Sequence, residues 1–146
     1  MAELTLHPMT EADHEATWSI HRDAFRDAVV RKLGRWDEEW LHEAWQSDIS
    51  QGEVLEVRLD GALVGYVQLV RGGGDVFIKT MAVTCRGQGV GTTLLGMLKD
   101  MAAREGATLT LSVYADNPAM ALYERAGFVV LGQEEIRVRM RWTPPG

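Results

Sequence analysis

The chain has 146 residues, a length that favours one domain, residues 1–146, built around a single core. Hydrophobic residues make up 46% of it and charged residues 25%, the composition of an ordinary soluble globular protein. The net charge is −6 at pH 7, and the lack of excess Lys and Arg argues against nucleic-acid binding.

The single cysteine, Cys85, excludes a disulfide within the chain and favours a reducing compartment. The first residues lack the basic and apolar regions of a signal peptide. No apolar run reaches the ~18 residues that a membrane span needs. We therefore expect a cytoplasmic protein with no membrane and no nucleic-acid partner.

A short strand at residues 4–6 is followed by two predicted helices. The first begins at Thr10, where Asp13 completes a weak capping box, and runs to about Lys32. The second covers roughly residues 36–46. Together they carry most of the tryptophans, which either pack in the core or form an aromatic wall for a cationic acceptor: Trp18, Trp36, Trp40 and Trp45.

The middle of the chain alternates strands and turns. Asp60-Gly61 separates two alternating runs, 54–59 and 62–70, which is a strong hairpin signal. A second glycine turn leads into a strand at 76–83. A glycine-rich turn then opens a helix that runs over 92–104 and ends at Gly106.

The C-terminal part has a strand at 109–113, a short helix and two last strands, 128–131 and 136–142. Asn117 is predicted to cap the helix, with Pro118 in its first position and Gly127 closing it. The order β-α-α-β-β-β-α-β-α-β-β predicts an α/β (α+β) fold with a mixed sheet flanked by helices. Strands 76–83 and 109–113 are the candidates for a parallel pair.

The turn at 86–91 has the geometry of a phosphate-binding site. A strand runs into it and a helix leaves it, so bare backbone N–H groups face an anion at the helix N-terminus. A nucleoside-triphosphate loop is excluded because no Lys follows Gly91. A dinucleotide loop is excluded because Thr92 stands where its third glycine belongs.

Two segments carry a resemblance to a known family. The pattern Arg86-x-x-Gly89-x-Gly91, after a strand ending Met81-Ala82-Val83, resembles the acyl-CoA-binding motif of the GNAT (GCN5-related N-acetyltransferase) superfamily. The stretch from Asn117 to Phe128 is similar to that family's second motif. The resemblance covers residues 76–130 closely and implies a GNAT-like N-acyltransferase fold. One departure is the short Thr84-Cys85 connection, which is commonly longer in the family.

The resemblance implies a role for each matching residue. The backbone of Met81, Ala82 and Val83 would pair with the pantetheine arm, because the neighbouring strand splays away there. An N–H near Met81 would polarise the thioester carbonyl. Asn117 would touch the pantetheine arm, and Tyr123 would protonate the departing thiolate. The CoA pyrophosphate would be held by the turn and the helix start: Arg86, Gly87, Gln88, Gly89, Val90, Gly91 and Thr92.

Other roles stay open on sequence alone. Tyr123 also fits a packing role, because it lies one helical turn after Ala119. The strand at 76–83 offers only Lys79 and Asp75 near a base position. We therefore consider a water-mediated relay, or His21 or Glu38 from the N-terminal helices, as the route for the amine proton. Cys85 reads as structural, and the histidines show no metal-ligand spacing, so no metal is expected.

The expected function is an acetyl-CoA-dependent N-acetyltransferase with acetyl-CoA as cosubstrate. A primary amine of a small molecule or peptide would attack the thioester directly in a ternary complex. One alternative is an acyltransferase with another acyl-CoA or another acceptor. A second alternative is a non-catalytic acyl-CoA-binding regulatory module. The family also makes a homodimer plausible.

Overall fold

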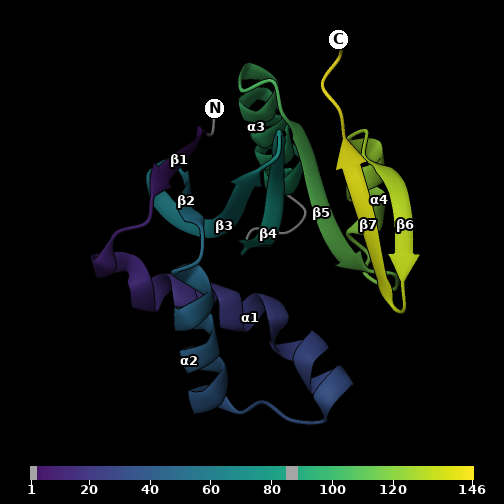
Figure 1. Ribbon diagram of the computed structural model, residues 1–146. Helices are drawn as coiled ribbons and strands as arrows, with labels where there is room; N and C mark the ends of the chain where they lie inside the picture. Colours follow the sequence, from purple (N-terminus) through teal and green to yellow (C-terminus); the bar gives the residue numbers. More distant parts are fainter. Residues whose placement is uncertain (1–2, 85–88) are drawn as a thin grey trace. The chain divides into compact units, whose positions relative to one another are not determined.

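The computed structural model describes residues 3–84 and 89–146. The helices and strands follow the predicted order, with one short 3-10 helix, η1, added near the N-terminus (Figure 1). In chain order they are β1 (Leu4–Pro8), η1 (Glu11–Asp13), α1 (His14–Leu33), α2 (Glu38–Ile49), β2 (Glu53–Leu59), β3 (Ala62–Gly72), β4 (Asp75–Val83), α3 (Val90–Arg104), β5 (Thr108–Tyr114), α4 (Met120–Arg125), β6 (Val129–Glu134) and β7 (Arg137–Trp142).

The strands form one mixed sheet in the order β1-β2-β3-β4-β5-β7-β6. Strands β4 and β5 are parallel, as expected for two strands joined by the crossover helix α3. The pairs β1–β2, β5–β7 and β6–β7 are antiparallel. The predicted α/β fold class with a mixed sheet flanked by helices is therefore confirmed.

The local signals have different outcomes. Asp60 and Gly61 have φ values of 52° and 86°, the two positive values that a type I′ hairpin turn requires, so this prediction is confirmed. The capping box at Thr10 is wrong. The Thr10 hydroxyl donates to the Asp13 carboxylate at 2.9 Å, and the Thr10 N–H donates to Glu56. The long-range partner Glu56 thus takes the Thr10 N–H, which a capping box would pair with the Asp13 carboxylate.

The chain divides into two compact units. Unit 1 comprises Met1–Gln68 and Thr80–Arg86, and unit 2 comprises Leu69–Lys79 and Gly87–Gly146. Strands β3 and β4 each pass from one unit to the other. That residues 1–146 form a single domain stays a prediction.

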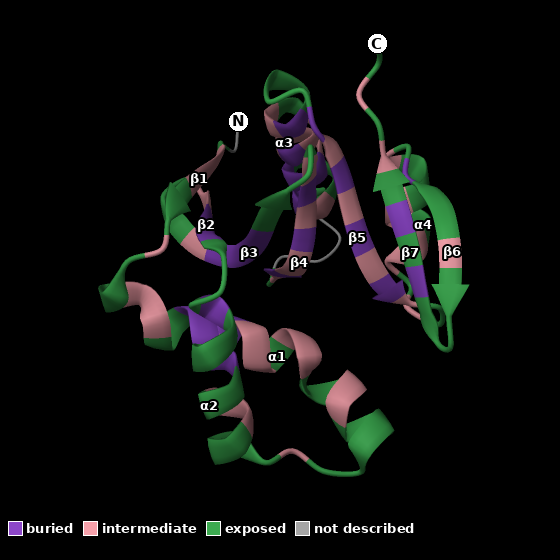
Figure 2. Ribbon diagram, in the orientation of Figure 1, coloured by how far each residue is buried: buried purple, intermediate pink, exposed green. Residues whose placement is uncertain are grey.

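The core of unit 1 is aromatic. Trp18 and Trp45 are each only 4% exposed and pack with the buried ring of Tyr66, while Trp40 is 61% exposed. The Trp18 ring lies 5.5 Å from the Trp45 ring and 4.8 Å from the ring of His42. Core packing therefore accounts for two of the four N-terminal tryptophans. Figure 2 shows the buried parts of the elements in purple.

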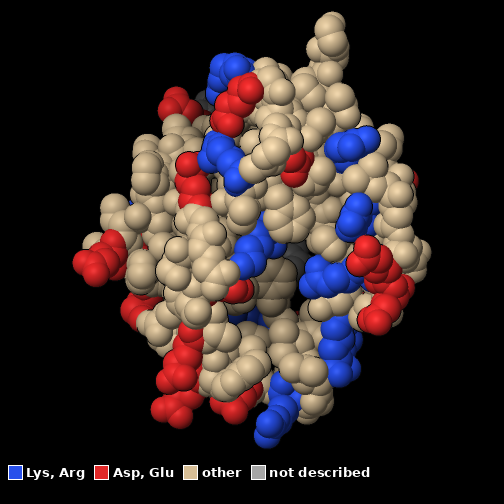
Figure 3. Space-filling model, in the orientation of Figure 1, with Lys and Arg blue, Asp and Glu red and all other residues tan. Residues whose placement is uncertain are grey.

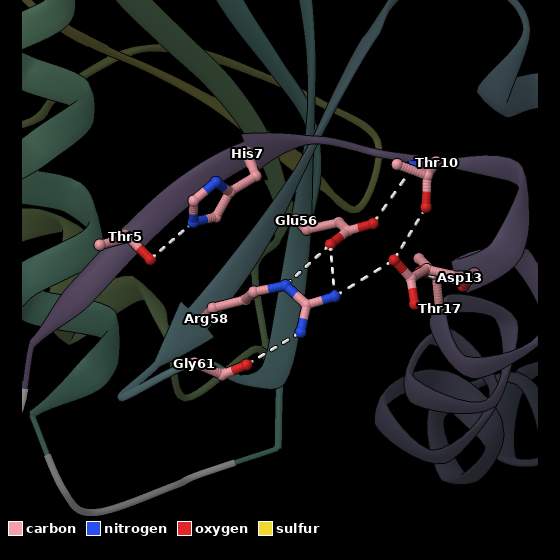
Figure 4. Close-up of polar contacts among 8 residues, drawn as sticks. All are labelled: Thr5, His7, Thr10, Asp13, Thr17, Glu56, Arg58 and Gly61. Atoms are coloured by element: carbon pink, nitrogen blue, oxygen red, sulfur yellow. Dashed lines mark hydrogen bonds and ion pairs between the residues drawn. The ribbon is translucent and has the colours of Figure 1, made fainter.

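Unit 1 also buries a carboxylate. Glu56 on β2 is 2% exposed, and its Oε1 accepts hydrogen bonds from the Arg58 guanidinium, whose Nη2 lies 2.8 Å away (Figure 4). The same guanidinium reaches Asp13 at 3.1 Å and the Gly61 carbonyl at 2.9 Å. One arginine thus joins η1 to the β2–β3 hairpin.

The core of unit 2 forms between α3 and the sheet. Leu94, Leu95 and Leu98 lie on one face of α3 and are buried, as are Leu109 and Leu111 on alternate positions of β5. This matches the helical and strand periods read from the sequence. Within residues 3–84 and 89–146, no helix combines the length and apolar character that spanning a membrane requires.

Candidate active site

The end of β4 carries the first set of predicted site residues. Ala82 is buried, and Met81 and Val83 are half-buried. Gly65 on β3 permits this arrangement, because a Cβ there would lie 2.3 Å from the Ala82 carbonyl oxygen. The N–H of Thr84 also donates to the Val64 carbonyl at 2.8 Å. The backbone at 81–84 is therefore held closely against β3.

The parallel ladder on the other side of β4 is short. Its register runs from Asp75 opposite Thr108 to Ile78 opposite Leu111, although β4 continues to Val83. Asp75 fixes the start of the ladder, because its carboxylate accepts from the hydroxyls of Thr108 and Thr110 at 2.7 and 2.6 Å. Asp75 is thus engaged as a structural acceptor.

The N-terminus of α3 carries the second set of predicted residues. Gly89 is the N-cap with φ of 74°, and no side chain caps it within the described part of the chain. The first turn holds no acidic residue, and its N–H groups have no intrahelical acceptor. This end of α3 therefore suits an anion. Cys85, Arg86, Gly87 and Gln88 lie outside the described residues.

Gly91 has a second role that the sequence did not reveal. A Cβ at Gly91 would lie 3.1 Å from Leu122 Cδ2 on α4, closer than most side-chain contacts allow. Val90 beside it is buried, and Thr92 is exposed. The glycine therefore serves the approach of α4 to α3 as well as any ligand.

The third set lies on and before α4. The Asn117 carboxamide oxygen accepts from the Ala119 N–H at 2.8 Å and so closes the turn before the helix. The predicted helix start at Asn117 and Pro118 is wrong, because α4 begins at Met120 with Ala119 as its N-cap. The NH₂ group of Asn117 is left as a donor. The ring of Tyr123 packs edge-on against Phe128 at 6.0 Å, and burial raises the pKa of its hydroxyl.

The two candidate bases in unit 1 are both engaged. The His21 Nδ1 lies 2.6 Å from the Tyr66 hydroxyl, which also accepts from Trp45 Nε1 at 3.2 Å. Burial lowers the pKa of His21 to about 4, against a smaller opposing effect of Asp48. The Glu38 carboxylate accepts from Trp36 and then from Arg22, and these hydrogen bonds lower its pKa.

The buried neutral His21 gives a testable pH dependence. Its pKa is lower in the folded chain than in the unfolded chain, so unfolding takes up a proton between pH 6.5 and 4. Stability is therefore full above pH 6.5 and falls as the pH drops, by about 2 kcal/mol at pH 5 for this group. Urea unfolding at pH 7 and pH 5 measures this loss. His21→Gln should show a smaller loss; an unchanged loss would contradict the assignment.

A cavity of about 490 Å³ lies within unit 2, where β5 and β7 meet the turn before β7. Its lining includes Ser112, Tyr114, Glu134, Arg137 and Arg139. These positions fall in or beside the strands predicted from the sequence and have no predicted functional role. The missed signal is the alternation of arginines at 137, 139 and 141, which places three cations on one face of β7.

A mixed sheet with a parallel β4–β5 pair, followed by a helix N-terminus that suits an anion, is the arrangement to be compared with known families. Residues 22–144 match the family model of the acetyltransferase (GNAT) domain. The chain belongs to the GNAT acetyltransferase family. No protein among the curated sequences matches it significantly.

Solved structures share the fold. The PaiA N-acetyltransferase of Thermoplasma acidophilum in complex with coenzyme A has a TM-score of 0.76 and 17% identity, over 97% of this chain and 99% of that one. The ribosomal-protein-S18-alanine N-acetyltransferase of Escherichia coli has a TM-score of 0.74 and 21% identity, over 99% of this chain and 97% of that one. The putative acetyltransferase yncA of Salmonella typhimurium with its cofactor acetyl-CoA has a TM-score of 0.62 and 21% identity, over 96% of this chain and 93% of that one.

Proposed function

We propose that the chain is an acetyl-CoA-dependent N-acetyltransferase that transfers an acetyl group to a primary amine. The observation that carries this proposal is the match of residues 22–144 to the GNAT domain, together with an N-terminus of α3 that no side chain of the described residues caps. The coenzyme A and acetyl-CoA bound to two structural neighbours support the same cosubstrate here.

The residues present fit the cofactor. Gly89, Val90, Gly91 and Thr92 would hold the pyrophosphate with backbone N–H groups, because no acidic side chain occupies the first turn of α3. Arg86, Gly87 and Gln88 would complete the loop. Met81, Ala82 and Val83 would bind the pantetheine arm as an added strand, since the β4–β5 register ends at Ile78. The Asn117 NH₂ group would donate to the same arm.

The chemical step needs a polarised carbonyl and a proton for the leaving group. The amine nitrogen attacks the thioester carbon while a backbone N–H near Met81 stabilises the oxyanion. The C–N bond forms, the C–S bond breaks, and Tyr123 gives its hydroxyl proton to the sulfur. The raised pKa of Tyr123 keeps that proton on the hydroxyl at neutral pH.

The amine proton leaves through water in this proposal. His21 is a weak base because its pKa is lowered to about 4, and the Glu38 carboxylate is held by Trp36 and Arg22. Direct attack requires no acyl-enzyme. Among the described residues, no cluster of His, Cys, Asp or Glu is placed to hold a metal ion, and none is proposed.

We further propose a cytoplasmic location and a small-molecule or peptide acceptor. A homodimer is supported by the edge strand β6, which exposes Val129, Val130 and Leu131. Sedimentation analysis of the purified chain tests the dimer.

The experiment that tests the function measures free CoA released from acetyl-CoA with a panel of primary amines and alcohols. N-Acetylation of an amine, identified by mass spectrometry, is the expected result. Turnover with only another acyl-CoA, or only an alcohol, would instead establish a different acyltransferase. Acetyl-CoA binding by calorimetry with no turnover would establish a regulatory module, and no binding would contradict every acyl-CoA function.

A further inference from the structure

The cavity on the sheet of unit 2 is lined by Arg137, which has no carboxylate partner among the described residues. Residues Arg137, Arg139 and Arg141 are exposed on β7, while Val138 and Met140 between them are buried. Figure 3 shows Lys and Arg side chains gathered over this part of the sheet. In a chain with a net charge of −6, these arginines bring positive charge to a surface that also carries Glu134 and Glu135.

Arg137 is oriented by its neighbours on β5. Its guanidinium lies 4.5 Å from the centre of the Tyr114 ring, and its Nη1 donates to Ser112 Oγ at 3.3 Å. Tyr114 is its direct cross-strand partner, whereas Glu134 is its partner on β6. Within the described part of the chain, the guanidinium forms no ion pair with Glu134 or any other carboxylate.

Two acidic side chains, Glu134 and Glu135, are also part of the lining. Glu134 lies 3.6 Å from Arg139 instead, and both are mostly exposed. Glu135 occupies the β6–β7 turn with φ of 55°. Arg137 therefore lines the cavity with its guanidinium stacked on Tyr114 and one hydrogen bond to Ser112, which leaves further N–H donors for bidentate binding of a carboxylate.

The cavity residue Tyr114 directly precedes, in sequence, the segment proposed for catalysis, which contains Asn117 and α4. Tyr114 ends β5, and the Ala115 N–H donates to the Ile136 carbonyl in the β6–β7 turn at 2.8 Å. Asn117 and α4 follow within unit 2. The carboxyl ends of parallel strands are a common place for ligands in mixed sheets.

We propose that this cavity binds a carboxylate of the acyl acceptor through Arg137, with Ser112 and Tyr114 holding the guanidinium in place. The acceptor class is then an amine that carries a carboxylate, as amino acids and acidic peptides do. That the bound carboxylate belongs to an acyl acceptor rests on the proposed N-acetyltransferase function. Carboxylate binding by the cavity is itself independent of turnover.

A direct binding experiment uses glutarate, with neutral glutaramide as the matched control. Glutarate should produce saturable NMR shifts of the Ser112 and Arg137 amides, and glutaramide should not. Arg137→Gln should weaken glutarate binding about tenfold or more, the loss expected for a charge-assisted pair. Arg141→Gln, on the same strand but outside the lining, should leave it nearly unchanged.

Glu134→Gln distinguishes an anion site from a cation site. Removing this carboxylate should strengthen glutarate binding, because Arg139 loses its neighbour. If glutarate shifts neither amide, or if 1,4-diaminobutane shifts them and Glu134→Gln abolishes that effect, the inference is overturned. These outcomes stand whether or not the protein acetylates any amine.

A kinetic experiment tests the acceptor class. Each of a series of ω-amino acids of increasing length is compared with its primary amide. The acids should have the lower KM, and Arg137→Gln should remove this preference. Equal KM values for acids and amides would overturn the acceptor class, whereas the proposed acetyltransferase function would survive.

Discussion

Tyr123→Phe is expected to lower kcat about 100-fold or more, with little change in the affinity for CoA. The variant removes only the hydroxyl that is proposed to protonate the departing sulfur, and general acids of this kind contribute at least that factor. The ring and its contact with Phe128 are kept. Steady-state kinetics with a competent amine, together with calorimetry of CoA binding, measure the two quantities separately.

Tyr66→Phe is the matched control for this prediction. It makes the same chemical change in unit 1, where the hydroxyl contacts Trp45 and His21. We expect it to lower stability by about 1 kcal/mol, because it leaves a buried donor without its partner. It should retain most of kcat. A Tyr123→Phe enzyme with kcat close to that of the parent would contradict the general-acid role.

Arg58→Met is expected to destabilise the fold by about 3 kcal/mol or more, because it leaves a buried carboxylate without its cation. Glu56 is 2% exposed and depends on Arg58 for its two shortest contacts. Urea unfolding at pH 7 measures the loss. Adding Glu56→Gln should recover part of it, because the carboxamide is uncharged.

Arg22→Met is the control for an exposed pair. The Arg22–Glu38 ion pair is 3.3 Å long, with side chains 33% and 48% exposed, so its removal should cost under about 1 kcal/mol. Equal losses in the two arginine variants would show that burial of Glu56 carries no special cost.

Local signals predicted most of the fold. Asp60-Gly61 defined its hairpin, and the glycines near 89 and 127 marked helix ends, because these conformations depend on neighbouring residues in the chain. The short capping box at Thr10 failed because Glu56, far away in sequence, takes the Thr10 N–H. A motif of four consecutive residues contains no information about a hydrogen-bond acceptor 46 residues away in sequence.

The parts of the candidate site that consist of consecutive residues could be predicted from the sequence. The parts that depend on contacts between neighbouring strands could not. The turn at 86–91 and the segment from Asn117 carry their pattern in order. The need for Gly65 comes from the Ala82 carbonyl on the next strand. The orientation of Arg137 comes from Ser112 and Tyr114, its neighbours across the sheet. Neither relation can be read without the strand register.

The passage of β3 and β4 through both compact units has a consequence for how the chain can be taken apart. Unit 2 holds residues 69–79 from the middle of the chain, between two segments of unit 1. No single cleavage of the backbone separates the units, and no contiguous fragment consists of one unit alone. Unfolding either unit also frays strands of the other, so truncation is expected to cost the whole protein its structure.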